Sequence, residues 1–334
     1  MKKIVLIGPY PPPVGGVSIH IQRLINMLGD DAIIKVIDES KEKKSWPFNL
    51  RSFNLYRYFR IISESDIVHI HSGKLILRFF HVFICRIVLR KYTVVTIHFN
   101  LEQGFPMRLT KYLLSICNHA ILVNEEGFAM MKTPSSCKYH LLPAFLPPVI
   151  SKEPELPKEV LQWLMKKKSQ GDIICVSNAG CLCIYNNQDL YGLDLCIEAL
   201  KKLDKKICIL FVIADNKPFN SLIEQYKQRI KNYGLNDRFL LWENSLSFVR
   251  LIKESHIVIR ATNTDGDALT IREALFFNKK VVTSDVVKRP EGVFLFRNRD
   301  VQGLVDSVRS AIDNPTPQGE KINYVSTYKE IYGI

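Results

Sequence analysis

Two carboxylates in the last third of the chain have the surroundings of a site for a phosphorylated ligand. Asp265 follows a β-branched run that ends at Arg260, and Glu273 lies eight positions further along, in a helical pattern. Asp267 between them is a good helix cap, and the N–H groups at the start of a helix attract anions. The pattern predicts a strand, a polar loop and a helix whose amino end binds phosphate. The backbone donors expected there are those of Ala268, Leu269 and Thr270.

A second set of candidate residues lies in the first half of the chain, where predicted strands end. Gly15 and Gly16 lie in a proline-rich loop before the first predicted helix, and glycine lets a phosphate approach the backbone closely. A plain strand-to-helix turn is the alternative for this loop. His98 ends a predicted strand and is the candidate catalytic residue of this half. His69 and His71, at the end of the neighbouring strand, are interpreted as structural residues.

These candidate residues need a scaffold, and the periodicity of the sequence predicts one. Short β-branched runs alternate with amphipathic stretches, which is typical of parallel sheets covered by helices. In the first half, the predicted strands cover residues 3–8, 32–38, 66–70, 93–98 and 120–124, and the predicted helices cover 17–28, 74–90 and 105–117. In the second half, the predicted strands cover residues 173–177, 207–214, 239–242, 257–260 and 280–283.

The chain is expected to form two domains. Five prolines between residues 142 and 157 exclude regular structure and predict a stiff connection there. A length of 334 residues also exceeds the usual size of a single hydrophobic core. We therefore predict an α/β fold of two doubly wound, Rossmann-like parallel-sheet domains, 1–148 and 149–334, that face a central cleft. The last helix is expected to be able to pack back on the first domain.

Composition limits the classes of partner and compartment. The chain carries 46 Lys and Arg against 33 Asp and Glu, a surplus that attracts polyanions without choosing among phosphates, nucleic acid and acidic lipid. Its eight cysteines form no Cys-x-x-Cys pair, so reduced thiols are expected rather than a zinc site or disulfides. No apolar stretch predicts a signal peptide or a membrane-spanning helix. We therefore expect a cytoplasmic protein.

The spacing of the two carboxylates resembles a family motif. Asp265 and Glu273 are similar to the acid-x7-acid motif of retaining GT-B glycosyltransferases of the family 4 or group 1 type. That family continues with Glu-Ala-Leu, a small turn and an apolar strand that ends in Ser-Asp, as residues 273–285 do here. Residues 191–199 are similar to its Lys-Gly-x-Asp-x-x-Ile-x-Ala helix start, and the pair Gly15-Gly16 is similar to its amino-terminal glycine loop.

The resemblance implies a role for each candidate residue. Glu273 would bind the ribose of the nucleotide, and Asp265 would lie beside the transferred sugar. His98 matches the histidine of the family's Thr-x-His strand end and would lie near the reacting centre. Gly16 would approach the donor phosphate or the acceptor. The diphosphate would be held by the backbone N–H groups of Ala268, Leu269 and Thr270.

The sequence departs from this family at two points. Many relatives hold the diphosphate with an Arg and a Lys, where this chain has Cys181 and Tyr191. Neighbouring cations would then have to stabilise the leaving group, and Arg260 is the one that we assign to donor binding. The second departure is Asp265 in place of the usual Glu, a shorter carboxylate that would suit a different sugar. The other nearby cations are Arg272, Lys288 and Arg289.

The same loop has an alternative interpretation as a metal site. The run Asp265-Gly266-Asp267 matches the Asp-x-Asp motif that holds a divalent cation in the other large glycosyltransferase fold. Here the motif opens a helix in the second of two domains, which disagrees with that fold. We therefore predict no metal and no cofactor, with a nucleoside-diphosphate sugar as a substrate.

Residues 50–91 mix basic and aromatic side chains, a combination that suits the surface of an anionic membrane. The alternative is a helix with apolar core residues and a solvated cationic face. Nucleic acid is excluded as a partner because no RRM, KH or zinc motif accompanies the charge. The hypothesis is peripheral contact with the inner face of the cell membrane. The cations of this stretch are Arg51, Arg57, Arg60, Lys74, Arg78, Arg86, Arg90 and Lys91.

We interpret the chain as a retaining glycosyltransferase that moves a sugar from a nucleoside-diphosphate sugar to a hydroxyl group. The resemblance implies the retention. The expected acceptor is a sugar or a lipid-linked oligosaccharide in the assembly of capsular polysaccharide, exopolysaccharide or O-antigen. One alternative is a sugar-nucleotide epimerase of the same architecture, which needs no acceptor. The other is a non-catalytic nucleotide-sugar-binding protein, which would explain the missing Arg and Lys.

Overall fold

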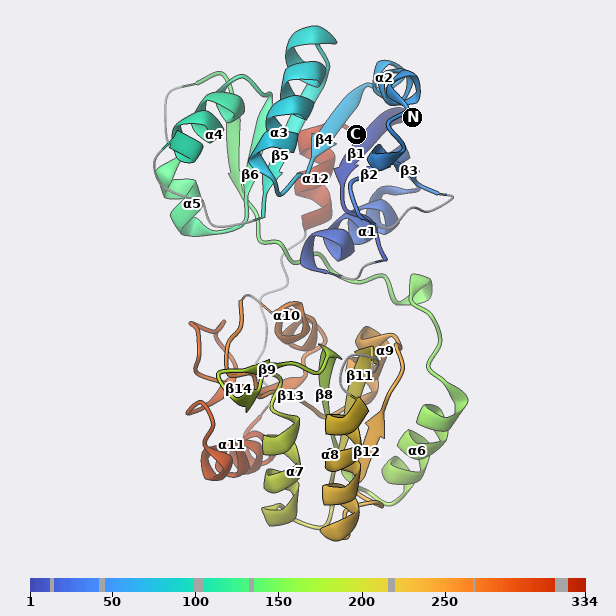
Figure 1. Ribbon diagram of the computed structural model, residues 1–334, viewed down its shortest axis with the longest axis vertical. Coiled ribbons are helices and arrows are strands. Elements are labelled where there is room, and N and C mark those ends of the chain that lie inside the picture. The colour runs from blue at the N-terminus through green and yellow to red at the C-terminus, as the bar shows by residue number, and fades with distance from the viewer. Residues whose placement is uncertain are drawn as a thin grey trace. The chain divides into compact units, whose positions relative to one another are not determined.

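The computed structural model describes residues 1–12, 15–41, 46–98, 105–131, 135–215, 220–266, 268–315 and 324–334. The chain divides into two compact units. Unit 1 consists of Met1–Val149 and Ile322–Ile334, and unit 2 consists of Ile150–Lys321. Each unit contains one parallel sheet covered by helices (Figure 1). The predicted fold class of two doubly wound, Rossmann-like α/β domains is therefore confirmed.

Unit 1 contains a sheet of seven strands in the order β3-β2-β1-β4-β5-β6-β7, in which every neighbouring pair is parallel. The strand order reverses between β1 and β4, so the loops after these two strands form the switch point at which doubly wound sheets bind ligands. The strands are β1 (Lys2–Gly8), β2 (Ala32–Asp38), β3 (Phe48–Asn49), β4 (Ile67–Ile70), β5 (Tyr92–Ile97), β6 (His119–Leu122) and β7 (Lys138–Leu141).

The helices of unit 1 include the last helix of the chain. Lys2 donates a hydrogen bond from Nζ to the Tyr332 carbonyl at 2.9 Å, and the side chains of Tyr328 and Tyr332 are buried. The last helix therefore belongs to the core of unit 1. The helices are α1 (Gly16–Leu28), η1 (Leu50–Ser52), α2 (Leu55–Ser63), α3 (Leu75–Val82), η2 (Phe83–Val88), α4 (Phe105–Ser115), α5 (Glu125–Met130) and α12 (Tyr324–Tyr332).

Unit 2 repeats this topology with six parallel strands in the order β12-β11-β8-β13-β14-β15, and its switch point lies between β8 and β13. The strands are β8 (Ile173–Cys181), β11 (Ile207–Asp215), β12 (Phe239–Trp242), β13 (Ile257–Arg260), β14 (Lys280–Ser284) and β15 (Phe294–Phe296), with an antiparallel pair β9 (Ile184–Tyr185) and β10 (Gln188–Asp189). The helices are η3 (Ile150–Lys152), α6 (Lys158–Ser169), α7 (Leu193–Lys202), α8 (Asn220–Asn232), α9 (Phe248–Glu254), α10 (Leu269–Phe276) and α11 (Val301–Asp313).

The central strand β11 is an uninterrupted apolar run in the sequence because both of its faces are buried. Ile209, Phe211 and Ile213 belong to one buried cluster, while Leu210 and Val212 belong to another. Successive side chains of a strand point to opposite faces, so both faces of this sheet are covered and no polar alternation remains.

Two features differ from the sequence-based expectation. The short strands β3, β7 and β15 lie at or near sheet edges and were not predicted. The single helix expected over residues 74–90 is found as α3 followed by η2, a stretch of π-helix. Within the described part of the chain, no helix combines the length and apolar character needed to cross a bilayer.

Candidate functional site

Asp265 lies in the loop after β13, at the switch point of unit 2, and is held by two arginines. Arg260 donates from Nε to Oδ2 at 3.1 Å and from Nη2 to Oδ1 at 3.0 Å. Arg289, beyond the end of β14, donates from Nη1 to Oδ2 at 2.9 Å, and the Thr262 hydroxyl donates at 3.2 Å. Burial by itself raises the pKa of Asp265, but hydrogen bonds and the charges of Arg260 and Arg289 bring it below the ordinary value. Asp265 is therefore ionised at neutral pH.

Two guanidinium groups contact the single carboxylate of Asp265, so their positive charges outnumber its negative charge. The side chain of Arg289 is only 2% exposed, and its Nη2 atom has no hydrogen-bond partner among the described residues. A buried donor without a partner is unfavourable, and an oxygen of a bound anion would satisfy it. Arg289 is therefore held in place by Asp265, and its Nη2 group is still available as a donor to a ligand. The sequence identified it only as one of several nearby cations.

The pairing of Arg260 was not predicted from the sequence. Its side chain is 14% exposed, it is bidentate to Asp265, and its guanidinium lies 5.5 Å from the centre of the Tyr191 ring. Arg260 was expected to contact phosphate. The structure gives it a carboxylate partner, so its first role in this state is to position Asp265, and contact with the donor stays a prediction.

Helix α10 begins beside this cluster. Its N-cap is Ala268, whose side chain makes no capping hydrogen bond. The sequence predicted Asp267 as the cap; that residue lies outside the described residues. The hydroxyl of Thr270, in the first turn, is also buried without a described hydrogen-bond partner. The first N–H groups of α10 and the positive end of its dipole therefore lie at this loop.

Glu273 lies on α10, one turn after Thr270, and is 4% exposed. Its neighbours Ile271 and Ala274 are part of a buried apolar cluster. A carboxylate at this depth is expensive to bury, so such a residue is kept for a specific interaction. The predicted contact with a ribose stays a prediction, and it requires the carboxylate to reach the loop end of the helix.

The loop before α7 brings Gly192 against the same strand end. Gly192 has a φ of 70°, and a Cβ at this position would lie 2.2 Å from the Ala261 carbonyl oxygen. Only glycine fits this approach. The preceding Tyr191 then lies beside Arg260, where the family typically has a lysine before its glycine. In this chain an aromatic ring therefore stands at the position of that lysine, and Arg260 lies beside it.

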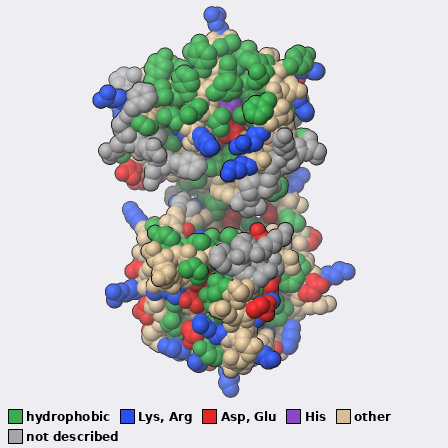
Figure 2. Space-filling model, viewed as in Figure 1, with side chains coloured by type: hydrophobic (Ala, Val, Ile, Leu, Met, Phe, Trp, Pro, Cys, Tyr) green, Lys and Arg blue, Asp and Glu red, His purple; other side chains and the backbone are tan. Residues whose placement is uncertain are grey.

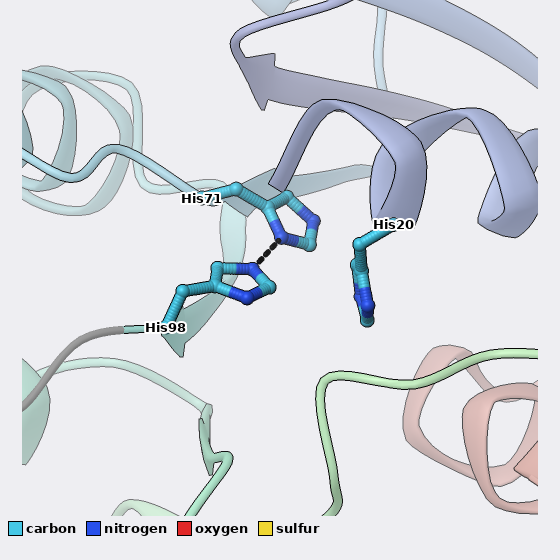
Figure 3. Close-up of side chains that lie close together, drawn as sticks. All are labelled: His20, His71 and His98. Atoms are coloured by element: carbon cyan, nitrogen blue, oxygen red, sulfur yellow. Dashed lines mark hydrogen bonds between the residues drawn. The ribbon is translucent and has the colours of Figure 1, made fainter. Parts of the chain in front are cut away.

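The switch point of unit 1 contains a cluster of histidines that includes the candidate His98 (Figure 3). His71 Nδ1 and His98 Nε2 share a hydrogen bond of 3.0 Å. His20, on α1, has its ring centre 4.8 Å from that of His98, and its Nδ1 donates to the Ala144 carbonyl at 2.7 Å. The sequence did not predict that His20 belongs to this group, because its partners lie far away along the chain.

His69 is bonded at both ring nitrogens, to the Tyr332 hydroxyl at 2.5 Å and to Thr96 Oγ1 at 2.7 Å. It therefore links β4, β5 and α12, which agrees with the structural role predicted for it. His71 is buried as well, and its Nε2 has no partner among the described residues. His98 is the most accessible member of the group, since it is only partly buried.

Burial keeps these imidazoles neutral. It lowers the pKa of His20 to about 4, and the Ala144 hydrogen bond only partly offsets this effect. Burial, together with neighbouring imidazoles, also lowers the pKa of His69, His71 and His98 well below the ordinary value. At neutral pH His98 therefore offers a neutral ring, which can donate or accept one hydrogen bond but carries no charge.

Ring nitrogens of His20, His71 and His98 lie within 4.8 Å of one another, a spacing that three metal ligands could have. Hydrogen bonds to Ala144 and Tyr328 already involve both nitrogens of His20, and His71 and His98 share one of their own. A metal bound by all three rings would have to replace a hydrogen bond of His20. We therefore interpret the group as a hydrogen-bonded neutral cluster. In unit 2, the two arginines on Asp265 make that carboxylate a poor ligand for a cation.

Acid is expected to destabilise unit 1. The unfolded chain protonates these histidines near pH 6.5, while the folded cluster resists protonation down to about pH 4 in the case of His20. The contribution of the neutral histidines to the free energy of unfolding is therefore complete above pH 6.5 and is lost as the pH falls toward 4. Each such histidine should lower the free energy of unfolding by about 1.4 kcal/mol per pH unit within this window.

Denaturant titrations between pH 7.5 and 5 would measure this slope. Trp46 is in unit 1 and the other two tryptophans, Trp163 and Trp242, are in unit 2, so replacing the latter two with Phe makes fluorescence report on unit 1. His20→Gln should reduce the slope by about one proton. An unchanged slope in that variant would contradict the proposed neutral state of His20.

Gly15 and Gly16 lie at the start of α1, also at the switch point of unit 1. Gly15 is the N-cap, and its N–H donates to Ser18 Oγ at 2.9 Å. A Cβ at Gly16 would meet no described atom within 4 Å. Packing among the described residues therefore gives no reason for glycine at this position. Close approach of a ligand would be a reason, and the donor-binding role of both glycines stays a prediction.

Known proteins of the same fold were found by comparison. Residues 182–329 match the family model described as glycosyl transferases group 1. A glycosyltransferase structure from Rickettsia africae is 16% identical, with a TM-score of 0.64, over 99% of this chain and 98% of that chain. HepE of Anabaena in complex with UDP is 14% identical, with a TM-score of 0.61, over 94% and 90% of the two chains. Sucrose-phosphate synthase from Thermosynechococcus elongatus is 12% identical, with a TM-score of 0.57, over 94% and 90%.

No curated protein sequence matches the chain. The solved structures are alike in fold along nearly the whole chain, and the sequence match covers α7, α10 and the loop that holds Asp265. The topology of both units and the family match of residues 182–329 indicate the same fold. The chain therefore has a GT-B fold, and its residues 182–329 match the model of the glycosyl transferases group 1 family.

Proposed function

We propose that this protein is a retaining glycosyltransferase that transfers a sugar from a nucleoside-diphosphate sugar to a hydroxyl group of an acceptor. The observation that carries the proposal is the cluster of Asp265, Arg260 and Arg289 beside the amino end of α10. This arrangement joins two guanidinium groups, a spare buried donor and a helix dipole at one switch point. A diphosphate is the ligand whose charge and oxygens fit these groups.

Each of these residues would have a different role in the reaction. The N–H groups of residues 268–270 and the spare Arg289 donor would hold the leaving diphosphate, so that negative charge on it is stabilised as the glycosidic bond breaks. Asp265 would lie beside the sugar, and Glu273 would bind the ribose. His98 would bind the sugar as a neutral hydrogen-bonding group. Retention of the anomeric configuration is proposed from the family resemblance.

We propose that no metal and no cofactor take part. In metal-dependent sugar transfer a divalent cation neutralises the diphosphate; here the surplus arginine charge would serve that purpose. Activity should therefore persist in the presence of EDTA. Loss of activity with EDTA, restored by a divalent cation, would contradict this proposal.

The acceptor and its location are proposed with the donor. We propose a sugar or lipid-linked oligosaccharide in the assembly of capsular polysaccharide, exopolysaccharide or O-antigen, at the inner face of the cell membrane. The net charge of +13 supports contact with anionic lipid. HepE, which has the same fold, is described in complexes with UDP, glucose and UDP-glucose, so UDP-sugars are the first donors to test.

A thermal-shift screen tests the donor site. A nucleoside diphosphate at about one hundred times its Kd should stabilise the protein by about 2.7 kcal/mol, which corresponds to a rise of roughly 5 to 10 °C in the Tm of unit 2. The matching nucleoside without phosphates should give no rise. The absence of a shift with every nucleoside diphosphate and its sugars would contradict the proposed donor site.

Measurement of the reaction products distinguishes a glycosyltransferase from an epimerase. The donor that gives the largest shift is incubated alone and then with acceptors, and the products are analysed by NMR. We expect release of nucleoside diphosphate to depend on the acceptor and the anomeric configuration to be retained. Conversion of the donor to an isomeric sugar nucleotide without acceptor would instead identify an epimerase.

A further inference from the structure

A row of large apolar side chains faces solvent along α3 and η2. Ile76, Phe79, Phe83 and Ile87 are 82%, 42%, 45% and 49% exposed. They recur at intervals of three or four residues, which is the spacing of one helix face. The opposite face of the same helix is already buried in the core of unit 1 through residues such as Val82 and Cys85. The exposed row is therefore additional to what the fold requires.

The π-helical segment keeps this row straight. Leu89 N–H donates to the Ile84 carbonyl at 2.9 Å, a bond that spans five residues and widens the turn. In a regular α-helix, side chains four positions apart are displaced from each other around the helix axis. The wider turn reduces this displacement. The Phe79 and Phe83 rings are stacked, with their centres 6.1 Å apart and their planes at 10°. The row thus presents a continuous apolar surface.

The neighbouring α2 extends this surface. Its Tyr58 hydroxyl bonds to His81 Nδ1 on α3 at 2.8 Å, so the two helices pack side by side. Large apolar side chains gather on this part of unit 1 in Figure 2. We define the apolar face as six exposed residues of α2, α3, η2 and the turn before α2, namely Phe53, Tyr56, Ile76, Phe79, Phe83 and Ile87.

Exposed cations accompany the apolar face. Arg57 and Arg60 lie on α2, Lys74 precedes α3, and Arg90 follows η2. Arg78, which the sequence included among the surface cations, is instead buried and donates to the carbonyls of residues 72 and 73. The apolar face therefore combines exposed aliphatic and aromatic side chains with several accessible positive charges.

We propose that the apolar face inserts into the headgroup region of an anionic lipid bilayer, with α3 and η2 lying in the plane of the interface. Aromatic and aliphatic groups of this kind enter the boundary between headgroups and acyl chains, while Lys and Arg bind the anionic headgroups. The charges favour lipid over a second copy of this chain, because a symmetric pair would bring the same cations together.

This inference deepens the proposed function and rests on it for the identity of the acceptor. Helix α3 starts four residues after His71, and the buried Arg78 fixes the short connection by its bonds to residues 72 and 73. The lipid surface and the histidine cluster are therefore joined by a rigid loop. A lipid-linked acceptor at this face would have its polar head directed to the carboxyl end of β4.

Cosedimentation of the full chain with vesicles tests the inference without any donor or acceptor. Vesicles of phosphatidylcholine with about one third phosphatidylglycerol should bind the protein, vesicles of phosphatidylcholine alone should bind it much less, and raised salt should weaken binding. Phe79→Ser with Phe83→Ser should lower binding by about tenfold or more. Arg57→Gln with Lys74→Gln should have an effect of similar size.

Matched controls use unit 2. Met165→Ser removes a side chain that is 66% exposed on α6, and Lys205→Gln with Lys253→Gln removes two exposed charges; neither should change vesicle binding. All variants should keep the wild-type Tm, which shows that they are folded. No preference for anionic vesicles in the wild type, or equal losses in the controls, would overturn the inference.

Sedimentation velocity tests the main alternative, which is that a second copy of the chain packs on the apolar face. A concentration-dependent dimer that the Phe79 and Phe83 changes dissolve, without vesicle binding, would overturn the inference and assign the apolar face to a second copy. Failure of nucleotides to shift the Tm would refute the proposed function and leave vesicle binding intact. The two ideas are thus tested by separate measurements.

Discussion

Asp265→Asn is expected to lower kcat by about a hundredfold to a thousandfold, the range found when one electrostatic group is removed at a reacting centre. The Asn side chain has almost the same shape but no charge, so Arg260 and Arg289 lose the carboxylate that both of them contact. They would then be free to pair more tightly with the diphosphate. We therefore expect donor binding to persist or increase while transfer is lost.

The variant needs a stability control, because Asp265 is a buried partner of two cations. Removing one partner of a buried ion pair destabilises a protein by about 3 to 5 kcal/mol. The Tm and the nucleotide-induced shift should be measured beside the rate of transfer. Asp265→Glu keeps the charge and restores the residue that the family usually has, so it should retain a larger share of activity than Asn. Full activity of Asp265→Asn would reduce the role of this residue to holding the loop.

Glu273→Ala is expected to raise the Kd of a nucleoside diphosphate by about tenfold to a hundredfold, which is the effect of losing hydrogen bonds to a charged group. Glu273→Gln keeps the volume of the side chain and an acceptor oxygen, so its effect should be smaller. The comparison matters because Glu273 is 4% exposed, and Ala leaves a cavity as well as removing a charge.

The ligand itself supplies the sharpest control for Glu273. Inorganic pyrophosphate contains the phosphates but no ribose, so its binding should be nearly unaffected in both variants. Isothermal titration calorimetry of the two ligands against wild type and variants measures the difference. Equal losses for pyrophosphate and for the nucleotide would indicate that Glu273 supports the shape of α10 and does not contact the sugar of the nucleotide.

The fold could be predicted from the sequence because its signals are local. The apolar run of β11 indicates a buried parallel strand, and the five prolines between residues 142 and 157 predict a connection between domains, without any knowledge of their partners. The weakest elements were missed for the same reason. Strand β3 has two residues and β15 has three, too few to give a period, and their existence depends on pairing with β2 and β14.

The candidate site could be predicted only in part. The carboxylate spacing of Asp265 and Glu273 and the helix start after residue 267 are visible in the sequence, since they lie within nine residues. That Arg289 shares Asp265 with Arg260, and has a donor left over, requires the end of β14 to lie beside the end of β13. Helix α10 begins after Ala268 as its N-cap, and the expected cap Asp267 lies outside the described residues.

Features encoded within one or two helical turns can be read from the sequence alone: the alternation of strands and helices, the family motif, and the basic and aromatic composition of residues 50–91. Which of these side chains share a site or a surface became known from the folded chain. It joined His20 to His71 and His98, buried Arg78 and left Phe79 and Phe83 exposed. The physical reason is that burial and charge pairing depend on contacts between segments far apart in the chain, and a pattern of neighbouring residues does not contain those contacts.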